Sequence, residues 1–317
     1  MVNFRFHLIS IIAVFLALGL GILMGSTVID KAIVDRLDRE IESVRTESDE
    51  LRTENAQLRD DLDRVDTYVA DSAAMAVEDR LDNVPVVILA ERAVGGETVD
   101  ATAALIRAAG ADAPAVIWLE DRWMLDDQNS IEALRGTLDT ATSAASVRDR
   151  ALDALARRIA EPPAAPEASD AGEEPVPDLL TRLSDAGFID VQGDDVDLAT
   201  FPAGPSRAIV VTGTDSLFSE SDLTVALTQA LVEADVSSVV GEVFVAGQSD
   251  DAPERGDAIA PVREDDTLNA TVSTVDDLDL VAGRVASVLA LEDLATGTVG
   301  HYGYGRGADQ IIPAAVR

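Results

Sequence analysis

The sequence contains no cysteine, only two histidines and only one lysine, Lys31. Without cysteine the chain has no disulfides, no thiolate metal sites and no cysteine nucleophile. Basic residues as a whole are scarce, because 24 of them face 59 acidic residues and give a formal net charge of −35. Such a charge repels nucleic acid and anionic lipid head groups, so we exclude nucleic acid as a partner. At 317 residues and 47% hydrophobic content, the chain is long enough for one sizeable globular core.

Charged residues are also absent from Leu8 to Ile29, a run of 22 positions. At about 1.5 Å per residue this run crosses a hydrocarbon layer of about 30 Å. A cleaved signal peptide is the alternative, but its apolar core usually has about 7–15 residues, and no A-x-A site closes this run. We therefore predict an uncleaved transmembrane helix within residues 1–30. Ala17, Gly21 and Gly25 lie on one helix face, which favours contact with a second membrane helix unless glycine is merely frequent there.

Helix breakers are missing beyond this segment, since no proline precedes Pro85 and no glycine lies between Gly25 and Gly95. The anchor can therefore continue as one helix. Within residues 31–80, apolar side chains follow a seven-residue repeat, which predicts a coiled coil about 50 Å long. The predicted dimer interface consists of Val34, Leu37, Ile41, Val44, Leu51, Asn55, Leu58, Leu62 and Val65.

The charges beside this apolar stripe indicate the direction of the partner helix. In a parallel homodimer each g position faces the e position five residues later on the other chain, and here this places acid against arginine. An antiparallel pair would set acid on acid and arginine on arginine. A buried Asn55 bonds its twin only in the aligned parallel dimer. We predict that dimer; a solvated single helix or a different partner chain is the alternative. The predicted interhelical ion pairs are Glu40 with Arg45, Glu47 with Arg52, and Glu54 with Arg59.

Short β-branched runs alternate with amphipathic stretches after the coil, as is typical of parallel strands buried on both faces. We predict an α/β domain over residues 84–317 with a mostly parallel sheet of Rossmann or flavodoxin type. A disordered insertion rich in proline and acid interrupts it at 161–177. The last helix is expected to have Asp276 or Asp277 as its N-cap. The predicted strands are 84–90, 114–120, 207–213, 237–245 and 271–275, and the predicted helices are 99–109, 131–138, 147–159, 178–186, 222–234 and 278–294.

No motif in this domain specifies a reaction or a cofactor. GGET at 95–98 lacks the G-x-G-x-x-G pattern, and TDS at 214–216 lacks a G-x-S-x-G elbow. Asp276, Asp277 and Asp279 are able to bind a metal or act as a base, but helix capping explains them. His301 is a weak metal candidate, because a histidine in a glycine-aromatic turn is more often structural. We predict no enzyme, no catalytic residue and no bound cofactor, with an enzyme at the switch point of the sheet as the minor alternative.

Three stretches of the chain resemble a known family. NFRFHLISIIAVFLALGLGILMGS at the N-terminus, and STVDDLDLVAGRVASVLALEDL and GTVGHYGYGRGAD near the C-terminus, are similar to the MctB family of actinobacterial envelope proteins. The resemblance covers anchor, coil and α/β domain, with a diverged middle. It implies copper transport or copper resistance, in mycobacteria as an outer-membrane channel, and it implies an extracytoplasmic globular domain. The family also appears as SteB, a cell-separation factor that controls peptidoglycan cleavage with a membrane partner.

The residues themselves offer few ligands for copper. Cu(I) prefers thiolates, thioethers and imidazoles, whereas this chain has no cysteine, two histidines and four methionines that form no cluster. Basic residues flank the anchor on both sides, so charge does not decide the side of the globular domain. We therefore interpret the protein as a membrane-anchored homodimer that scaffolds or regulates copper export with an envelope protein partner, copper being the transported ion. A septal scaffold for peptidoglycan cleavage is the alternative.

Overall fold

The computed structural model describes residues 4–161, 177–193, 201, 206–214, 216–220, 222–247 and 252–314, and the side chains of 26–34, 113–114 and 219–220 lie outside this description. The chain divides into two compact units, Met1–Thr67 and Tyr68–Arg317. The sequence analysis drew this border later, between residues 80 and 84. The predicted insertion at 161–177 lies almost wholly outside the described residues.

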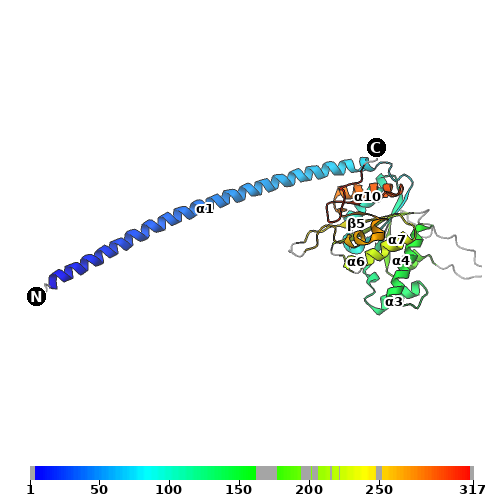
Figure 1. Cartoon of the computed structure of the whole chain (residues 1–317), viewed down its shortest axis with the longest axis horizontal. Coiled ribbons are helices and arrows are strands. Elements are labelled where there is room, and N and C mark those ends of the chain that lie inside the picture. Colours follow the sequence, from blue (N-terminus) through cyan, green and yellow to red (C-terminus); the bar gives the residue numbers. More distant parts are fainter. Residues whose placement is uncertain are drawn as a thin grey trace, which may run out of the picture. The chain divides into compact units, whose positions relative to one another are not determined.

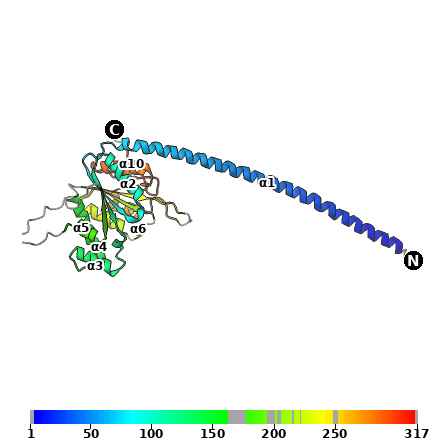
Figure 2. The same ribbon diagram turned by 180° about the vertical axis from the view of Figure 1, so that it is seen from behind.

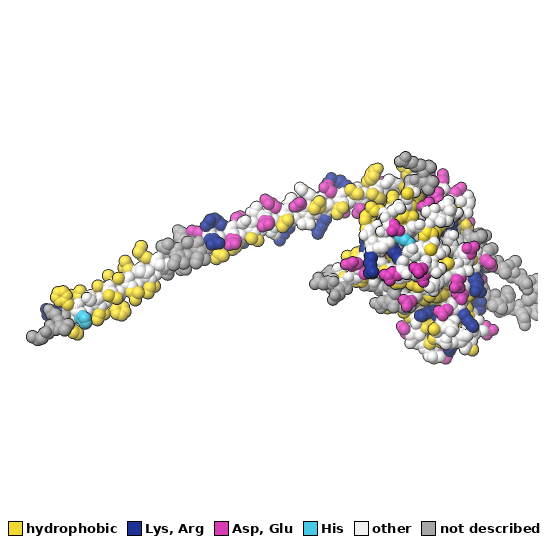
Figure 3. Space-filling view, viewed as in Figure 1, with side chains coloured by type: hydrophobic (Ala, Val, Ile, Leu, Met, Phe, Trp, Pro, Cys, Tyr) yellow, Lys and Arg dark blue, Asp and Glu magenta, His cyan; other side chains and the backbone are white. Residues whose placement is uncertain are grey.

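A single helix, α1, runs from Phe4 to Val77 over 74 residues (Figure 1). Its continuity follows from the lack of proline and, after Gly25, of glycine. Phe4–Gly25 is long and apolar enough to cross a membrane, and none of its side chains is buried in the single chain. Figure 3 shows hydrophobic side chains around this N-terminal stretch of α1, and acidic and basic side chains farther along the helix. The expectation of one long apolar N-terminal helix is confirmed.

The coil segment of α1 leaves its apolar stripe uncovered in the single chain. Leu37, Ile41, Leu51 and Leu62 are between 48% and 62% exposed. The amide of Asn55 donates to the carbonyl oxygen of Leu51 in its own helix, at 2.9 Å. The apolar stripe is thus open to solvent in the single chain, and the parallel dimer stays a prediction.

The sheet of the second unit has seven strands in the order β3-β2-β1-β4-β5-β6-β7. All neighbours pair in parallel except β2 and β3. The chain leaves β1 toward β2 and β3 and later returns to the other side of β1 with β4, which is the Rossmann order 3-2-1-4-5-6 of doubly wound sheets with β7 added at one edge. The predicted α/β domain with a mostly parallel sheet is confirmed. The strands are β1 Pro85–Glu91, β2 Asp112–Leu119, β3 Ile189–Gln192, β4 Arg207–Gly213, β5 Ser238–Val243, β6 Ser273–Val275 and β7 His301–Tyr302.

The helices of this unit follow the predicted alternation with strands. Polar caps fix several starts: Asp127 accepts from the backbone N–H groups of Asn129 and Ser130, and Asp178 accepts from that of Leu180. The short elements α6, α8, α9, β3 and β7 were not predicted, because a few residues carry no readable periodicity. The helices are α2 Gly96–Ala108, α3 Gln128–Thr137, α4 Ala144–Ala160, α5 Leu179–Asp185, α6 Leu217–Glu220, α7 Leu223–Glu233, α8 Ala260–Glu264, α9 Asp266–Asn269 and α10 Val281–Leu294, with 3-10 turns η1 Arg92–Val94 and η2 Asp121–Met124.

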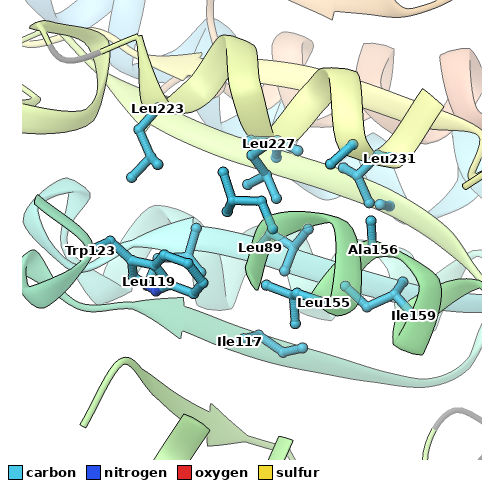
Figure 4. Close-up of a cluster of buried hydrophobic side chains, with 14 of the residues drawn as sticks. Leu89, Ile117, Leu119, Trp123, Leu155, Ala156, Ile159, Leu223, Leu227 and Leu231 are labelled. Carbon is cyan, nitrogen blue, oxygen red and sulfur yellow. The ribbon is translucent and has the colours of Figure 1, made fainter. Parts of the chain in front are cut away.

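Two hydrophobic cores form on opposite faces of the sheet, because successive strand side chains point to opposite faces. Val87 and Leu89 of β1 belong to one core, and Val86 and Ile88 belong to the other. The first core packs against α4 and α7, whose leucines meet over the strands in Figure 4. The second packs against α2 and α10 (Figure 2) and against the last turns of α1. Burial on both faces explains the near-continuous apolar runs of the sequence.

Candidate functional site

The buried charged side chains of the α/β domain lie at or near the carboxyl ends of the parallel strands. Open α/β sheets bind ligands outside these ends. Here the ends of β5 and β6 hold four carboxyl groups and meet two arginines from the loop and helix that follow β5. We call this group the carboxylate network, and it consists of Glu242, Asp276, Asp277, Asp279, Arg255 and Arg263.

Glu242 lies inside β5 and is fully buried. Its carboxylate accepts the backbone N–H groups of Gly256 at 3.0 Å and of Ala258 at 3.2 Å, and so holds the loop after β5. Burial, together with the charge of Asp276, raises the pKa of Glu242 to about 7. The carboxyl group therefore holds a proton far more readily than a carboxyl in water.

Asp276 and Arg263 form the most buried ion pair among the described residues. Arg263 Nη1 lies 3.1 Å from Asp276 Oδ2, with side-chain exposures of 5% and 0%. The other carboxylate oxygen accepts the backbone N–H groups of Tyr304 at 2.8 Å and Gly305 at 3.0 Å. Gly303, at φ +122°, lies so close that a Cβ atom would stand 2.1 Å from Asp276 Oδ1. The pair thus fixes the turn after β7 as well as β6 itself.

Arg263 also binds three further groups from the β6–β7 edge. Its Nε donates to Thr274 Oγ1 at 2.8 Å, and its other nitrogens donate to the carbonyl oxygens of Tyr302 and Arg306. A planar guanidinium can satisfy several acceptors at once, which a lysine ammonium cannot do with the same geometry. The side chain is therefore a structural clamp between α8, β6 and β7.

Asp277 is buried, and neither of its carboxyl oxygens has a hydrogen-bond partner among the residues that the structure describes. Burial raises its pKa to about 7, and the neighbouring charges of Asp276 and Asp279 add to this rise, whereas Arg255 opposes it. The N-cap prediction for Asp276 and Asp277 is wrong. Helix α10 begins at Val281, and the residue before it, Leu280, makes no side-chain cap. Asp276 instead binds Arg263 and the turn after β7, and Asp277 is buried close to Gly283 of α10.

Asp279 is the partly exposed member of the carboxylate network. Arg255 bridges both of its oxygens at 2.6 and 2.8 Å and places its guanidinium 4.5 Å from the ring of Phe244. Arg255 also donates to the backbone oxygen of Asp276 at 2.8 Å. A bidentate arginine of this kind fixes geometry as well as charge. The loops after β5 and β6 are therefore tied together.

His301, the predicted weak metal candidate, lies in β7 with 7% of its surface exposed. Its Nδ1 is 3.0 Å from Thr274 Oγ1, and the same hydroxyl oxygen accepts from Arg263 Nε, so Thr274 links the imidazole to the guanidinium. Burial and the nearby Arg263 charge lower the pKa of His301 and favour the neutral ring. Its ring contacts a pocket of about 280 Å³ that Arg306 and Asp309 also line. These contacts give His301 a structural role.

The order of the strands changes direction between β1 and β4, and many doubly wound folds bind a phosphate group at this switch point. The residue at the end of β1 here is the buried Glu91. It accepts hydrogen bonds from the Ser216 hydroxyl and from the backbone N–H of Phe218, and burial raises its pKa. The GGET stretch forms the start of helix α2: Gly95, at φ +78°, is the residue before the helix, and Gly96 is its first residue. Glu91 and Glu242 were missed by the sequence analysis. The readable signal was an acid directly after the apolar run 84–90 and another inside the run 237–245.

The remaining predicted contact residues lie on α1. A Cβ atom built on Gly21 or Gly25 meets nothing within 4 Å, so this face is open to a neighbour. Arg52, predicted to pair between chains, bonds Asp49 of its own helix at 3.1 Å, and both side chains are more than 70% exposed. The side chain of Val34 lies outside the described residues. Within the described parts of the chain, no group of three or more His, Cys, Asp or Glu residues is arranged to hold a metal ion.

The Asp277→Asn variant should be more stable than the parent at pH 8, with a difference that closes near pH 4. The pKa of Asp277 is about 7 in the folded state and 3.8 in the unfolded chain. Between these two pH values, Asp277 holds a proton in the folded protein but has lost it in the unfolded chain. Stability therefore falls as the pH rises from about 4 to 7, and the full cost is present above 7. An unpaired buried polar group costs about 1–3 kcal/mol.

The measurement is thermal unfolding of the full chain in detergent, followed by tryptophan fluorescence, because Trp118 and Trp123 are the only tryptophans and both lie in the α/β domain. Asp149→Asn, on the exposed face of α4, is the matched control and should not change the pH profile. Glu242 titrates in the same range, so the Asp277 variant keeps part of the slope. A variant less stable than the parent at pH 8 would contradict the buried, proton-holding state of Asp277.

Taken together, the helix and the sheet define a class: an α/β protein with one N-terminal helix long and apolar enough to span a membrane. The chain belongs to the MctB family, whose model, described as "Copper transport outer membrane protein, MctB", matches residues 1–313. The resemblance noted in the sequence is thereby confirmed.

Relatives of the chain are known from three mycobacteria. The proteins called "Copper transporter MctB" from Mycobacterium tuberculosis and Mycobacterium bovis are 29% identical to it over 320 residues, which cover 97% of this chain and 98% of theirs. The protein of the same name from Mycobacterium leprae is 26% identical over 327 residues, which cover 98% of this chain and 99% of that one. The similarity therefore includes α1 as well as the α/β domain.

Proposed function

We propose that this protein takes part in copper transport and copper homeostasis at the cell envelope. The observation that carries this proposal is family membership along nearly the whole chain, together with relatives named copper transporters. In this role α1 anchors the protein through Phe4–Gly25, and the α/β domain lies on the extracytoplasmic side. The protein acts as a scaffold or regulator of export with an envelope protein partner, and copper is the transported ion.

The working unit in this proposal is a parallel coiled-coil dimer. What supports it is the uncovered apolar stripe of α1, whose leucines at residues 37, 51, 58 and 62 are all more than half exposed. Soluble surfaces rarely leave such a row of large apolar side chains without a partner. The acid and arginine positions that flank the stripe complement each other only in the parallel arrangement. Ala17, Gly21 and Gly25 extend the same pairing into the membrane, where small residues let two helices approach closely.

The experiment that tests the copper role is a measurement of cell-associated copper after a copper challenge. A strain that lacks the gene should accumulate more copper than its parent, and the intact gene should restore the parental level. Cell-associated zinc in the same cultures is the matched control and should not change. Unchanged copper would overturn the proposal, and unchanged copper with chained, unseparated cells would point instead to the septal scaffold.

A further inference from the structure

The exposed large apolar side chains of the α/β domain gather at one edge of the sheet. Among the described residues, four of these side chains lie in the segments that directly follow four neighbouring strands. We call them the edge patch: Leu217 after β4, Val245 after β5, Leu280 after β6 and Tyr304 after β7, with exposed fractions of 44%, 61%, 38% and 58%. The carboxyl edge of an open α/β sheet is also where such folds bind ligands.

Hydrogen bonds hold these loops side by side. The backbone N–H of Val245 donates to Thr214 Oγ1 at 2.9 Å, which joins the loops after β4 and β5. The N–H of Tyr304 donates to Asp276 Oδ1 at 2.8 Å, which joins the loops after β6 and β7. The bridge from Arg255 to Asp279 joins the two middle loops. Neighbouring strands lie about 4.8 Å apart, so the patch extends over about 15 Å, wide enough for one helix or one extended segment.

The charges around the edge patch select its partner. Glu97, Asp100, Asp222 and Glu254 are exposed acids of the segments that start at this edge. Arg255 and Arg284 at this edge are already engaged, because Arg255 binds Asp279 and Arg284 donates to two carbonyl oxygens of the loop after β6. The exposed Arg306, two residues after Tyr304, pairs with Glu264. An apolar surface with an acidic rim repels anionic membranes and attracts cationic polypeptides.

We propose that the edge patch is a docking site for a polypeptide segment that combines large apolar side chains with arginine or lysine. The apolar side chains of the segment cover Val245, Leu280 and Tyr304, and its cations pair with the acidic rim. The proposal concerns a protein partner and stands apart from the copper role, because it follows from the edge loops of this chain and not from its family.

The test is selection of peptides on the full chain. A phage-displayed library of random dodecapeptides is panned against the protein in nanodiscs of neutral phosphatidylcholine, after depletion on empty nanodiscs. The enriched sequences should each carry basic and large apolar residues. Synthetic peptides of these sequences should bind the triple variant Val245→Ser, Leu280→Ser, Tyr304→Ser at least tenfold more weakly than they bind the parent protein. High salt should also weaken their binding to the parent.

The double variant Ile311→Ser, Ile312→Ser is the matched control, since these residues are also about half exposed but lie in the C-terminal tail. It should bind the peptides like the parent. Tryptophan fluorescence checks that the triple variant is folded, and if it is not, Glu97→Gln with Glu254→Gln must weaken binding instead. A lack of enrichment, enrichment of acidic or uncharged peptides, or equal binding to parent and patch variants would overturn the docking site. Copper accumulation is measured separately, so failure here leaves the copper role intact.

Discussion

Replacing Arg263 with alanine is expected to destabilise the α/β domain by about 3–5 kcal/mol, the usual cost of removing one partner of a buried ion pair. The substitution leaves Asp276 charged, with 0% of its side chain exposed, and removes the donors that serve Thr274, Tyr302 and Arg306. Three segments then lose their common attachment, because α8, β6 and the turn after β7 all meet at this guanidinium. Urea unfolding of the full chain in detergent, followed by tryptophan fluorescence, measures the loss.

Arg306→Ala is the matched control for this prediction. Arg306 also pairs with an acid, Glu264 at 3.3 Å, but the two side chains are 69% and 67% exposed. An exposed pair contributes at most about 1 kcal/mol, so the control should unfold nearly as the parent does. Equal losses for the two variants would refute the clamp role of Arg263.

A double-mutant cycle separates the ion pair from the other bonds of Arg263. Asp276→Asn, combined with Arg263→Met, removes both charges and keeps most of the side-chain volume. The double variant should recover part of the stability that Arg263→Met alone has lost, because no buried charge is left unpaired. A double variant that loses the sum of the two single losses would show that the pair contributes little beyond its separate hydrogen bonds.

Replacing both Leu51 and Leu58 with proline is expected to abolish the dimer and to leave the variant unable to restore the parental copper level in a deletion strain. The free energy of unfolding of the α/β domain should not change. Each proline costs about 3 kcal/mol or more in a helix interior, and both positions belong to the stripe that the single chain leaves exposed. Light scattering of the full chain in detergent measures the mass, and cell-associated copper measures function. A variant that complements the deletion fully would show that the coil is only a tether.

Alanine at the same two positions tests whether the dimer depends on the apolar contacts of the stripe or only on the helical conformation of α1. Leu51→Ala with Leu58→Ala keeps a strong helix former at each site but removes the apolar contact, so the dimer should weaken while α1 stays helical. Thr53→Ala with Asp60→Ala changes the opposite face of the same helical turns and is the matched control. If both pairs of substitutions weaken the dimer equally, the partner helix does not lie on the predicted stripe.

Most of the fold could be predicted because its elements have a local signature. The uncharged run near the N-terminus and the seven-residue repeat are properties of a single helix, readable without knowledge of any neighbour. The apolar runs of β1, β2, β4 and β5 were also readable, since strands buried on both faces need apolar residues at every position. The strands β3 and β7 have four and two residues, and such short segments carry no signal of their own.

The candidate site shows the limit of this reading. Asp276 and Asp277 precede a helix, and by local rules an aspartate at that place is a cap. Their actual surroundings come in part from distant segments of the chain: Asp276 meets Arg263 and the turn at Gly303, and Asp277 is buried near the charge of Arg255. Glu242 binds the N–H groups of residues 14 and 16 positions away. No periodicity predicts such contacts, because they depend on which strands become neighbours.

The sequence by itself determined the long N-terminal helix, the alternation of strands and helices, and the apolar stripe with its complementary charges. Each of these depends on interactions within a few turns of helix or on the burial of a whole strand. The tertiary structure alone decided the order of the strands, the buried carboxyl groups with pKa values near 7, and the edge patch. The physical reason is that desolvation and exposure belong to a place in the fold. A carboxyl group or a leucine acquires them only when segments far apart in the chain meet around it.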